Sequence, residues 1–230
     1  MGLKESGLRG SLRNVSVGID AIPDSAVFHQ PWTEGSGTTA EDVIGSNDGT
    51  ITTTDQWVSN SSFEGGFGLE FGDVEEDSGE YVDLGSSIVD YTGQTYIAFT
   101  VSDIPQSDDP RTTLYQDTTD STIRSFSTDE GQLRVQDMPN RRAWNNPDSG
   151  LQRVGVWSDW DNGETRIYAN GIRVDDDDGG GTATAGDGIT IGNLPRGDFP
   201  FSEEMDQPIG YENVPDADQI AQDDYEATIG

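Results

Sequence analysis

The feature that most constrains the fold is a series of short segments in which apolar and polar side chains alternate, separated by turns rich in Asp, Asn and Gly. The alternation is clearest over residues 94–103, where one face of an extended strand would carry Tyr96, Ala98 and Thr100 and the other Ile97, Phe99 and Val101. A repeat of two residues is typical of β-strands. Many such strands at short spacing predict an antiparallel β-sandwich.

Turn signals connect these segments into hairpins. Segments 123–127 and 132–136 flank Asp129-Glu130-Gly131, and segments 151–157 and 165–168 flank Asp161-Asn162-Gly163. Asn-Gly is a strong signal for a tight turn. A helix is expected only near the end, where Asp216 can cap a short helix that runs to about Tyr225.

Two features modify the strand pattern. Pro208 falls inside the expected strand 205–211, which indicates a strand edge or a bulge at that position. The run Asp175–Asp178 is followed by three glycines and is interpreted as a solvated loop, because it lacks the ligand order of a calcium loop.

Charge limits the partners of this chain. The 230 residues carry a formal net charge of −32, and only 31% of them are hydrophobic. Such a composition can indicate disorder, but five Trp, seven Tyr and eight Phe favour a folded domain. We interpret the acidity as a surface adapted to multimolar salt, where the Debye length of about 3 Å at 1 M screens neighbouring carboxylates. The same charge argues against nucleic acid as a partner.

Residue types that are scarce exclude several chemistries. Cysteine is absent and His29 is the single histidine, so disulfide scaffolds, thiolate metal sites and multi-histidine zinc sites are excluded. No run approaches the ~20 apolar residues that span a bilayer, and the first residues lack the apolar core of a secretory signal.

The first 24 residues differ from the rest, because residues 1–18 carry a net charge of +2 in an acidic chain. We therefore predict a docking arm over 1–24 and a β-domain over 25–230. The arm would bind a partner chain or a neighbouring copy through apolar and basic side chains, namely Leu3, Lys4, Leu8, Arg9, Leu12, Arg13 and Val15. The alternative is an N-terminal strand packed on the chain's own sheet.

An ordered set of segments resembles the laminin-G-like, concanavalin-A-like jelly rolls over roughly residues 26–226. The segments are 32–42, 45–50, 65–71, 80–85, 154–157, 165–171, 189–192 and 201–206. The resemblance implies an all-β, antiparallel β-sandwich (jelly roll) of two curved sheets, with an extended N-terminal arm and a short C-terminal helix. The chain departs from the family at Arg153, where a histidine is typical, and at 203–208, where the family usually ends Gly-x-Ile-Asp-Glu-Val.

The resemblance also implies a structural calcium ion near the two ends of the chain. Calcium takes 6–8 oxygen ligands as a rule, and the matching positions are Glu34, Asp48 and Asp206. The alternative is that these are ordinary acids on an acidic surface.

Related jelly-roll glycosidases carry Glu-x-Asp-x-x-Glu on one strand, which supplies a nucleophile and an acid. The nearest match begins at Glu204 and Asp206, but its third member is Ile209, which cannot donate a proton. His29 has no companion motif for a serine hydrolase. We expect that this chain is not an enzyme.

Carbohydrate binding is the commonest non-catalytic task of the family, and sugars need aromatic faces with polar groups at the rim. The candidate residues are the Trp residues of polar segments and the single basic pair, namely Trp57, Trp144, Trp160, Arg141 and Arg142. The alternative is that these residues cap the core or form a subunit interface. Trp32 and Trp157 are expected in the core.

Together these features predict a homo-oligomeric, non-enzymatic structural protein on the surface or tail fibre of a halophilic virus, with a lectin-like domain that binds host glycans. One alternative is an extracellular glycan-binding protein or glycoside hydrolase of a haloarchaeon. Another is a purely architectural subunit that has no ligand.

The charge interpretation predicts that the protein loses tertiary structure on dialysis from multimolar salt into dilute buffer, because its carboxylates are then no longer screened. Near-UV circular dichroism measures this loss. A spectrum that does not change at low salt contradicts the interpretation.

Overall fold

The structure is a computed structural model that describes residues 25–54, 56–72, 80–86, 88–89, 93–104, 112–119, 122–129, 132–136, 142–145, 149–177, 188–193 and 200–229. The predicted docking arm, with all of its residues from Leu3 to Val15, lies outside the described residues. Every statement below on what the structure contains refers to this part of the chain.

Two eight-stranded antiparallel sheets form the molecule. Sheet A runs in the order β14 (Ile172–Asp177), β13 (Glu164–Ala169), β12 (Gln152–Asp159), β7 (Gln94–Val101), β16 (Met205–Glu212), β5 (Phe67–Leu69) and β4 (Trp57–Ser59), and β1 (Ala26–His29) also pairs with β16. Sheet B runs in the order β11 (Arg142–Asn145), β10 (Gln132–Gln136), β9 (Thr122–Asp129), β8 (Thr112–Thr119), β15 (Ile189–Ile191), β6 (Val82–Asp83), β3 (Gly49–Ile51) and β2 (Thr39–Ala40). A short 3-10 turn, η2 (Glu64–Gly66), precedes β5.

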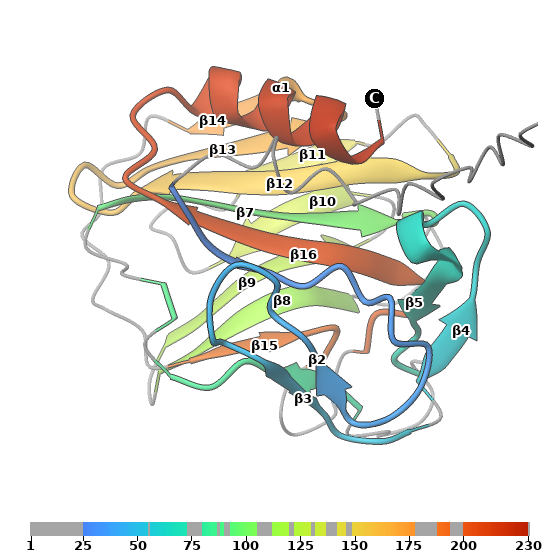
Figure 1. Ribbon diagram of the computed structural model, residues 1–230. Coiled ribbons are helices and arrows are strands. Elements are labelled where there is room, and N and C mark those ends of the chain that lie inside the picture. The colour runs from blue at the N-terminus through green and yellow to red at the C-terminus, as the bar shows by residue number, and fades with distance from the viewer. Residues whose placement is uncertain are drawn as a thin grey trace, which may run out of the picture.

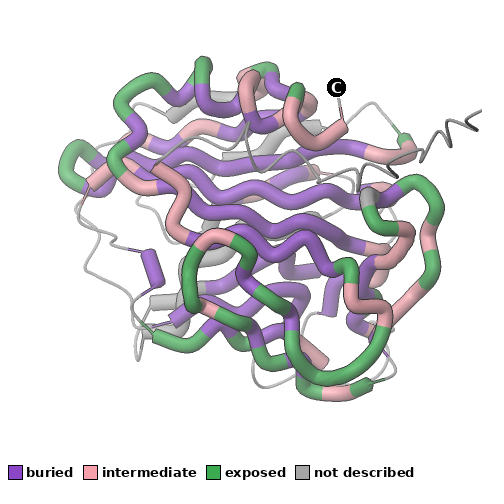
Figure 2. Tube along the Cα trace, in the orientation of Figure 1, coloured by how far each residue is buried: buried purple, intermediate pink, exposed green. Residues whose placement is uncertain are grey.

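The sheets are stacked, and the helix α1 (Ala217–Thr228) lies beside β12, β13 and β14 of sheet A (Figure 1). Strand backbone is largely buried and the connecting loops hold most of the exposed residues (Figure 2). The predicted all-β antiparallel sandwich with a short C-terminal helix is therefore confirmed.

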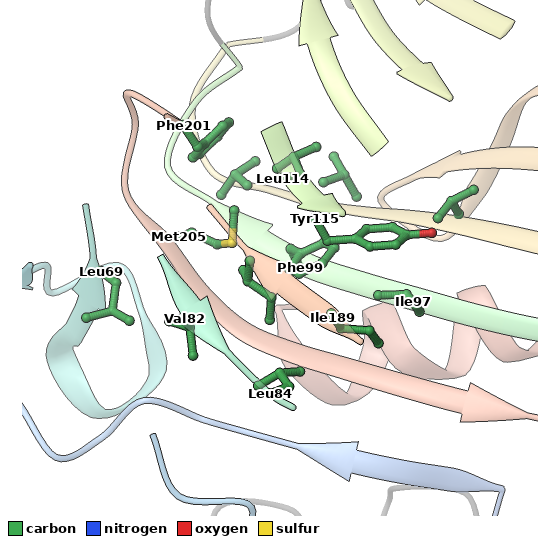
Figure 3. Close-up of a cluster of buried hydrophobic side chains, with 14 of the residues drawn as sticks. Leu69, Val82, Leu84, Ile97, Phe99, Leu114, Tyr115, Ile189, Phe201 and Met205 are labelled. Atoms are coloured by element: carbon green, nitrogen blue, oxygen red, sulfur yellow. The ribbon is translucent and has the colours of Figure 1, made fainter. Parts of the chain in front are cut away.

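Strand alternation fills two separate cores. From β7, Ile97, Phe99 and Val101 enter the main cluster between the sheets, where they meet residues of both sheets such as Met205 and Ile189 (Figure 3). The opposite face of β7 supplies Tyr96 and Ala98 to a second cluster under α1. Burial of one large apolar side chain contributes roughly 1.5–3 kcal/mol, so both faces of sheet A contribute to stability. Trp32 and Trp157 are buried, as predicted.

The predicted hairpins β9–β10 and β12–β13 are both present. In the β12–β13 turn, Oδ1 of Asp159 accepts the Asn162 amide N–H at 3.0 Å, and Oδ2 accepts Asn162 Nδ2 at 3.0 Å and Gln94 Nε2 at 3.1 Å. Burial alone would raise the pKa of the Asp159 carboxyl, but these hydrogen bonds lower that pKa below its ordinary value. The turn is thus fixed by one carboxylate.

Pro208 occupies a bulge, one of the two positions predicted for it. The register between β16 and β7 shifts between Asp206 and Ile209, and Gln207 has a φ of 50°. Because β16 is an interior strand, Pro208 could not have kept regular pairing there without losing a ladder bond. Its carbonyl accepts the Gln30 N–H at 3.0 Å.

The prediction of a solvated loop over Asp175–Asp178 is wrong for its first three residues, because β14 extends to Asp177. In the register, Asp175, Asp176 and Asp177 stand opposite Ile167, Arg166 and Thr165. A strand at the edge of a sheet tolerates charged residues, which also discourage pairing with other chains. Sequence alternation does not show this, because three identical residues have no period.

A buried ion pair ties α1 to sheet A. Arg153 of β12 donates from Nε and Nη2 to the two carboxylate oxygens of Asp224 at 2.8 and 2.9 Å, and from Nη1 to the Gln207 carbonyl at 2.7 Å and Thr100 Oγ1 at 3.1 Å. Tyr211 donates to the same carboxylate at 3.3 Å. Burial disfavours the guanidinium charge, but Asp224 raises the pKa of Arg153 above its ordinary value.

The helix itself begins as predicted. Oδ1 of Asp216 accepts the Gln219 N–H at 3.1 Å, which caps the first turn. The Gln219 side chain, however, donates to Asp223 at 2.7 Å and does not return to the cap. The helix also runs three residues past the predicted end at Tyr225.

Substitution of Asp224 by Asn is expected to lower the free energy of unfolding by about 3–5 kcal/mol, because it leaves a buried guanidinium without its counter-charge. Denaturant titration in high salt measures the change. The control is Glu226→Gln on the exposed side of the same helix, where we expect a change within about 0.5 kcal/mol. If the Asp224→Asn protein matches this control, the ion pair does not stabilise α1.

Candidate functional site

The outward face of sheet A is closed. Tyr96, Trp157, Tyr168 and Tyr211 lie on it, and all four are buried in the cluster that α1 covers. Trp157 donates from Nε1 to the Val214 carbonyl at 2.8 Å. This aromatic face is therefore occupied by the chain's own C-terminal segment.

The outward face of sheet B is polar. Four residues stand opposite one another on adjacent strands, namely Thr50, Asp83, Thr190 and Gln116, and we call them the polar row. Their strand neighbours Ile51, Val82, Ile191 and Tyr115 all lie in the main core. Because side chains alternate along a strand, the polar row faces away from the core. Strands about 4.8 Å apart give it a length of about 14 Å.

A register shift extends this face along β8. The shift lies between Thr113 and Tyr115, and both Leu114 and Tyr115 lie in the main core. Thr113 and Gln116 therefore share the outward face. Gln116 is 6% exposed, and neither its Oε1 nor Oγ1 of Thr113 has a hydrogen-bond partner in the protein.

Hydrogen bonds within the protein hold two side chains of the polar row and a nearby arginine in place. Oδ1 of Asp83 accepts the Gly85 N–H at 2.8 Å, and Thr190 donates to the Asn193 carbonyl at 3.3 Å. On β10, Arg134 donates from Nε and Nη2 to Oε1 of Gln132 at 3.1 and 2.8 Å. Amides, hydroxyls and one carboxylate on a rigid sheet can exchange hydrogen bonds with a ligand rich in hydroxyl groups.

Charge also distinguishes this part of the chain. Residues 111–145, which include β8 to β11, carry five arginines and five acidic residues, so the formal charge of −32 lies entirely outside them. Strand alternation did not reveal this face, because Ser and Thr dominate β8 and β9. A count of charges in a moving window would have found it.

The structure does not gather the three predicted calcium ligands. Glu34 accepts the Glu41 N–H at 2.7 Å, Asp48 accepts the Asp42 N–H at 2.9 Å, and the buried Asp206 accepts the Gln207 N–H at 2.7 Å. Across the described residues, no group of three or more His, Asp or Glu side chains could hold a metal ion. Calcium held by fewer side chains and by loop carbonyls stays a prediction.

A different carboxylate organises the loop that follows β1. Asp42 accepts the N–H groups of His29, Ile44 and Asn47 at 3.0, 3.2 and 3.1 Å. Gly45 lies so close that a Cβ there would meet the Asp42 carboxylate at 2.5 Å. The acidic residues of this loop thus serve its conformation, a role that sequence reasoning assigned to none of them.

The two predicted sugar-binding residues Trp57 and Trp160 differ in how far they are buried. Trp57 is half-buried on β4 and donates from Nε1 to the Gly37 carbonyl at 2.9 Å. Trp160 is 4% exposed and donates to Thr95 Oγ1 at 2.9 Å, so its prediction as a sugar platform is wrong. The polar sequence around Trp160 belongs to a tight turn, from which the indole returns to the main core.

The other candidates lie around β11. Trp144 and Arg142 stand opposite Leu133 and Val135 in the register of β10 and β11, and their side chains are outside the described set. Arg141 lies outside the described residues. The roles predicted for these three residues stay predictions.

The nearest match to a glycosidase motif is distorted by the bulge. Glu204 precedes β16 and contacts Nδ2 of Asn60, whereas Asp206 is buried and Ile209 lies in the cluster under α1. His29 is 4% exposed, and neither of its ring nitrogens has a hydrogen-bond partner in the protein. Burial and the nearby Arg153 lower the pKa of His29 to about 4.

Within the described residues, no helix has the length and apolar character needed to cross a membrane.

No protein-family model matches this chain, and no curated protein matches it by sequence. Solved structures do match its fold. Trypanosoma rangeli sialidase has a TM-score of 0.65 and 14% identity over 89% of this chain, which spans only 33% of the sialidase.

Two further structures show the same fold in shorter proteins. Domain 4 of AbnA, a GH43 extracellular arabinanase from Geobacillus stearothermophilus, was solved with arabinotriose and has a TM-score of 0.62 and 16% identity, covering 86% of this chain and 97% of the domain. The binding domain of botulinum neurotoxin serotype C1 has a TM-score of 0.65 and 14% identity, covering 89% of this chain and 52% of that one. At such identity the likeness shows the fold, an antiparallel β-sandwich of jelly-roll type.

The environment of His29 predicts a specific pH dependence. With a pKa of about 4 in the folded protein and about 6.5 when unfolded, the unfolded chain binds more protons between these values. His29 therefore costs stability as the pH falls from 6.5 to 4, by about 3 kcal/mol in total. Replacement by Phe should remove this loss, and it leaves no hydrogen bond broken.

The measurement compares the unfolding free energies of the wild-type and His29→Phe proteins at several values between pH 4 and 7. The difference between the two proteins isolates His29 from the 44 carboxylic acids. Proton NMR can follow the single histidine directly. Parallel curves for the two proteins, or a pKa near 6.5, contradict the described environment.

Proposed function

We propose that this chain is a non-catalytic carbohydrate-binding protein that uses the outward face of sheet B. The observation that carries the proposal is the polar row, together with the oxygens of Gln116 and Thr113 that lack partners; both of these residues lie in the segment 111–145, which has no net charge. An unpaired buried polar atom is costly, and a sugar hydroxyl can satisfy it.

Proteins of the same fold supply further support. They include a sialidase in complex with sialic acid, an arabinanase domain in complex with arabinotriose, and botulinum neurotoxin type C, whose cell entry depends on interaction with two ganglioside molecules. On sheet A, α1 covers the outward aromatic residues Tyr96, Trp157, Tyr168 and Tyr211. Sheet B is thus the better candidate for a ligand-binding surface.

The proposal does not include catalysis. Most glycoside hydrolases use two carboxyl groups, ~5–5.5 Å apart in retaining enzymes. The described polar row contains one carboxylate, that of Asp83. The enzymatic alternative, a glycoside hydrolase, is tested by incubation with polysaccharides in high salt and analysis for released sugars.

We further propose that this chain is a virion surface or tail-fibre protein of a halophilic virus and that it assembles into the particle through residues 1–24. The extreme acidity and the contrasting charge of the first 18 residues support it. The alternative setting is the exterior of a haloarchaeal cell. Mass spectrometry of purified particles distinguishes the two.

The binding face is tested by a glycan array in high salt, followed by calorimetry of the strongest hits with two variants. Gln116→Ala and Asp83→Asn should each weaken binding at least about tenfold, equivalent to about 1.4 kcal/mol, because the first removes an amide of the polar row and the second replaces an acceptor oxygen by an NH2 donor. Asp161→Asn removes one acidic charge on the exposed β12–β13 turn and should leave affinity unchanged within about twofold. Equal affinities for all three variants contradict the proposal.

A further inference from the structure

A second group of side chains lies at the edge of the sandwich and includes no residue of the polar row. There β4 is the last strand of sheet A and β2 the last strand of sheet B. The chain between β1 and β2 runs from one sheet to the other and includes residues 34–38, which we call the edge turn (Figure 1).

Two half-buried aromatic residues lie on neighbouring strands at this edge. Trp57 pairs with Leu69, and Phe67 pairs with Ser59. Trp57 and Phe67 therefore share one face of the β4–β5 hairpin as diagonal neighbours, about 7–8 Å apart. Both residues are only partly buried, and Trp57 packs on one side against the main core.

The edge turn contacts both rings through its glycines. A Cβ at Gly35 would come within 2.8 Å of the Phe67 ring, and the Gly37 carbonyl accepts Nε1 of Trp57 at 2.9 Å. Both glycines have positive φ, 65° and 96°. A Cβ at Gly37 would meet nothing within 4 Å, so the space beside the Trp57 contact is open.

Glu34 is the first residue of the edge turn, and only one of its two carboxylate oxygens accepts a hydrogen bond from the protein. Its Oε1 accepts the Glu41 N–H at 2.7 Å. Its Oε2 is buried and has no hydrogen-bond partner in the protein. A carboxylate oxygen can only accept hydrogen bonds, so the group that completes this site must be a donor.

We infer that Trp57, Phe67 and Glu34 form a second binding site, for one uncharged sugar ring. The C–H face of the ring packs on the aromatic side chains, and a ring hydroxyl donates to Oε2 of Glu34. An acidic sugar such as sialic acid is excluded, because its carboxylate repels that of Glu34. This inference extends the proposed function, but the site shares no residue with the polar row.

The test uses two-dimensional NMR of the full chain in high salt, with the methyl glycosides of glucose, galactose, mannose and arabinose as uncharged probes. The methyl glycoside of N-acetylneuraminic acid is the anionic probe. The indole N–H of Trp57, assigned with Trp57→Phe, reports on the edge site, and the side-chain amide of Gln116 reports on the polar row.

We expect at least one uncharged probe to shift the Trp57 signal, and the anionic probe to leave it unchanged. Glu34→Gln, which keeps an oxygen for the Glu41 N–H, and Trp57→Leu should each weaken that binding at least about tenfold. Glu41→Gln, an exposed acid in the same loop, and Gln116→Ala should leave it unchanged.

The inference is overturned if no uncharged probe shifts the Trp57 signal, if Glu34→Gln and Trp57→Leu bind as the wild type does, or if the anionic probe binds there equally well. If a probe shifts only the Gln116 signal, the edge site is overturned and the polar row is supported. If a probe shifts only the Trp57 signal, the edge site is supported and the polar row is overturned. The two proposals can therefore fail separately.

Discussion

A guanidinium buried beneath the C-terminal helix must keep its charge, because arginine is not deprotonated in proteins. Asp224 supplies the opposite charge, and Thr100, Gln207 and Tyr211 supply further hydrogen bonds around the pair. Such a network holds α1 at one position on sheet A, since any other position would separate two buried charges. The aromatic face under α1 is consequently a second core, and both proposed ligand sites lie elsewhere, on sheet B and at the sandwich edge.

The bulge in β16 belongs to the same network. Gln207 and Pro208 stand opposite a single residue of β7, so β16 has one additional residue there, and the Gln207 carbonyl is then available to Arg153. The Pro208 carbonyl meets the Gln30 N–H on the other side of the strand. A break in the ladder thus lets one strand bind a side chain and a neighbouring loop. The sequence departs from the laminin-G-like pattern at these same positions, 153 and 203–208.

Sequence patterns predict correctly those features of the fold that depend on interactions between neighbouring residues. Strand alternation over residues 94–103, the Asn162-Gly163 turn and the Asp216 cap each depend on a few neighbouring residues, and each is present. Sequence patterns do not predict the burial of a side chain whose surroundings come from residues far away in the sequence. The polar residues beside Trp160 in the sequence predict an exposed side chain, yet its indole donates a hydrogen bond to Thr95, 65 positions away in the sequence. The polar row required the order of strands in sheet B, which no local pattern contains.

The position of β16 has a consequence for how the chain acquires its structure. This strand begins 176 residues after the end of β1, yet it lies between β7 on one side and β1 and β5 on the other. In the described chain, β1 pairs with no other strand, so the first strand waits for residues 205–212 before it has a partner. Pairings between such distant segments slow folding, because a long loop must close before they form. A ribosome-bound chain therefore cannot complete sheet A before residues 205–212 have left the ribosome.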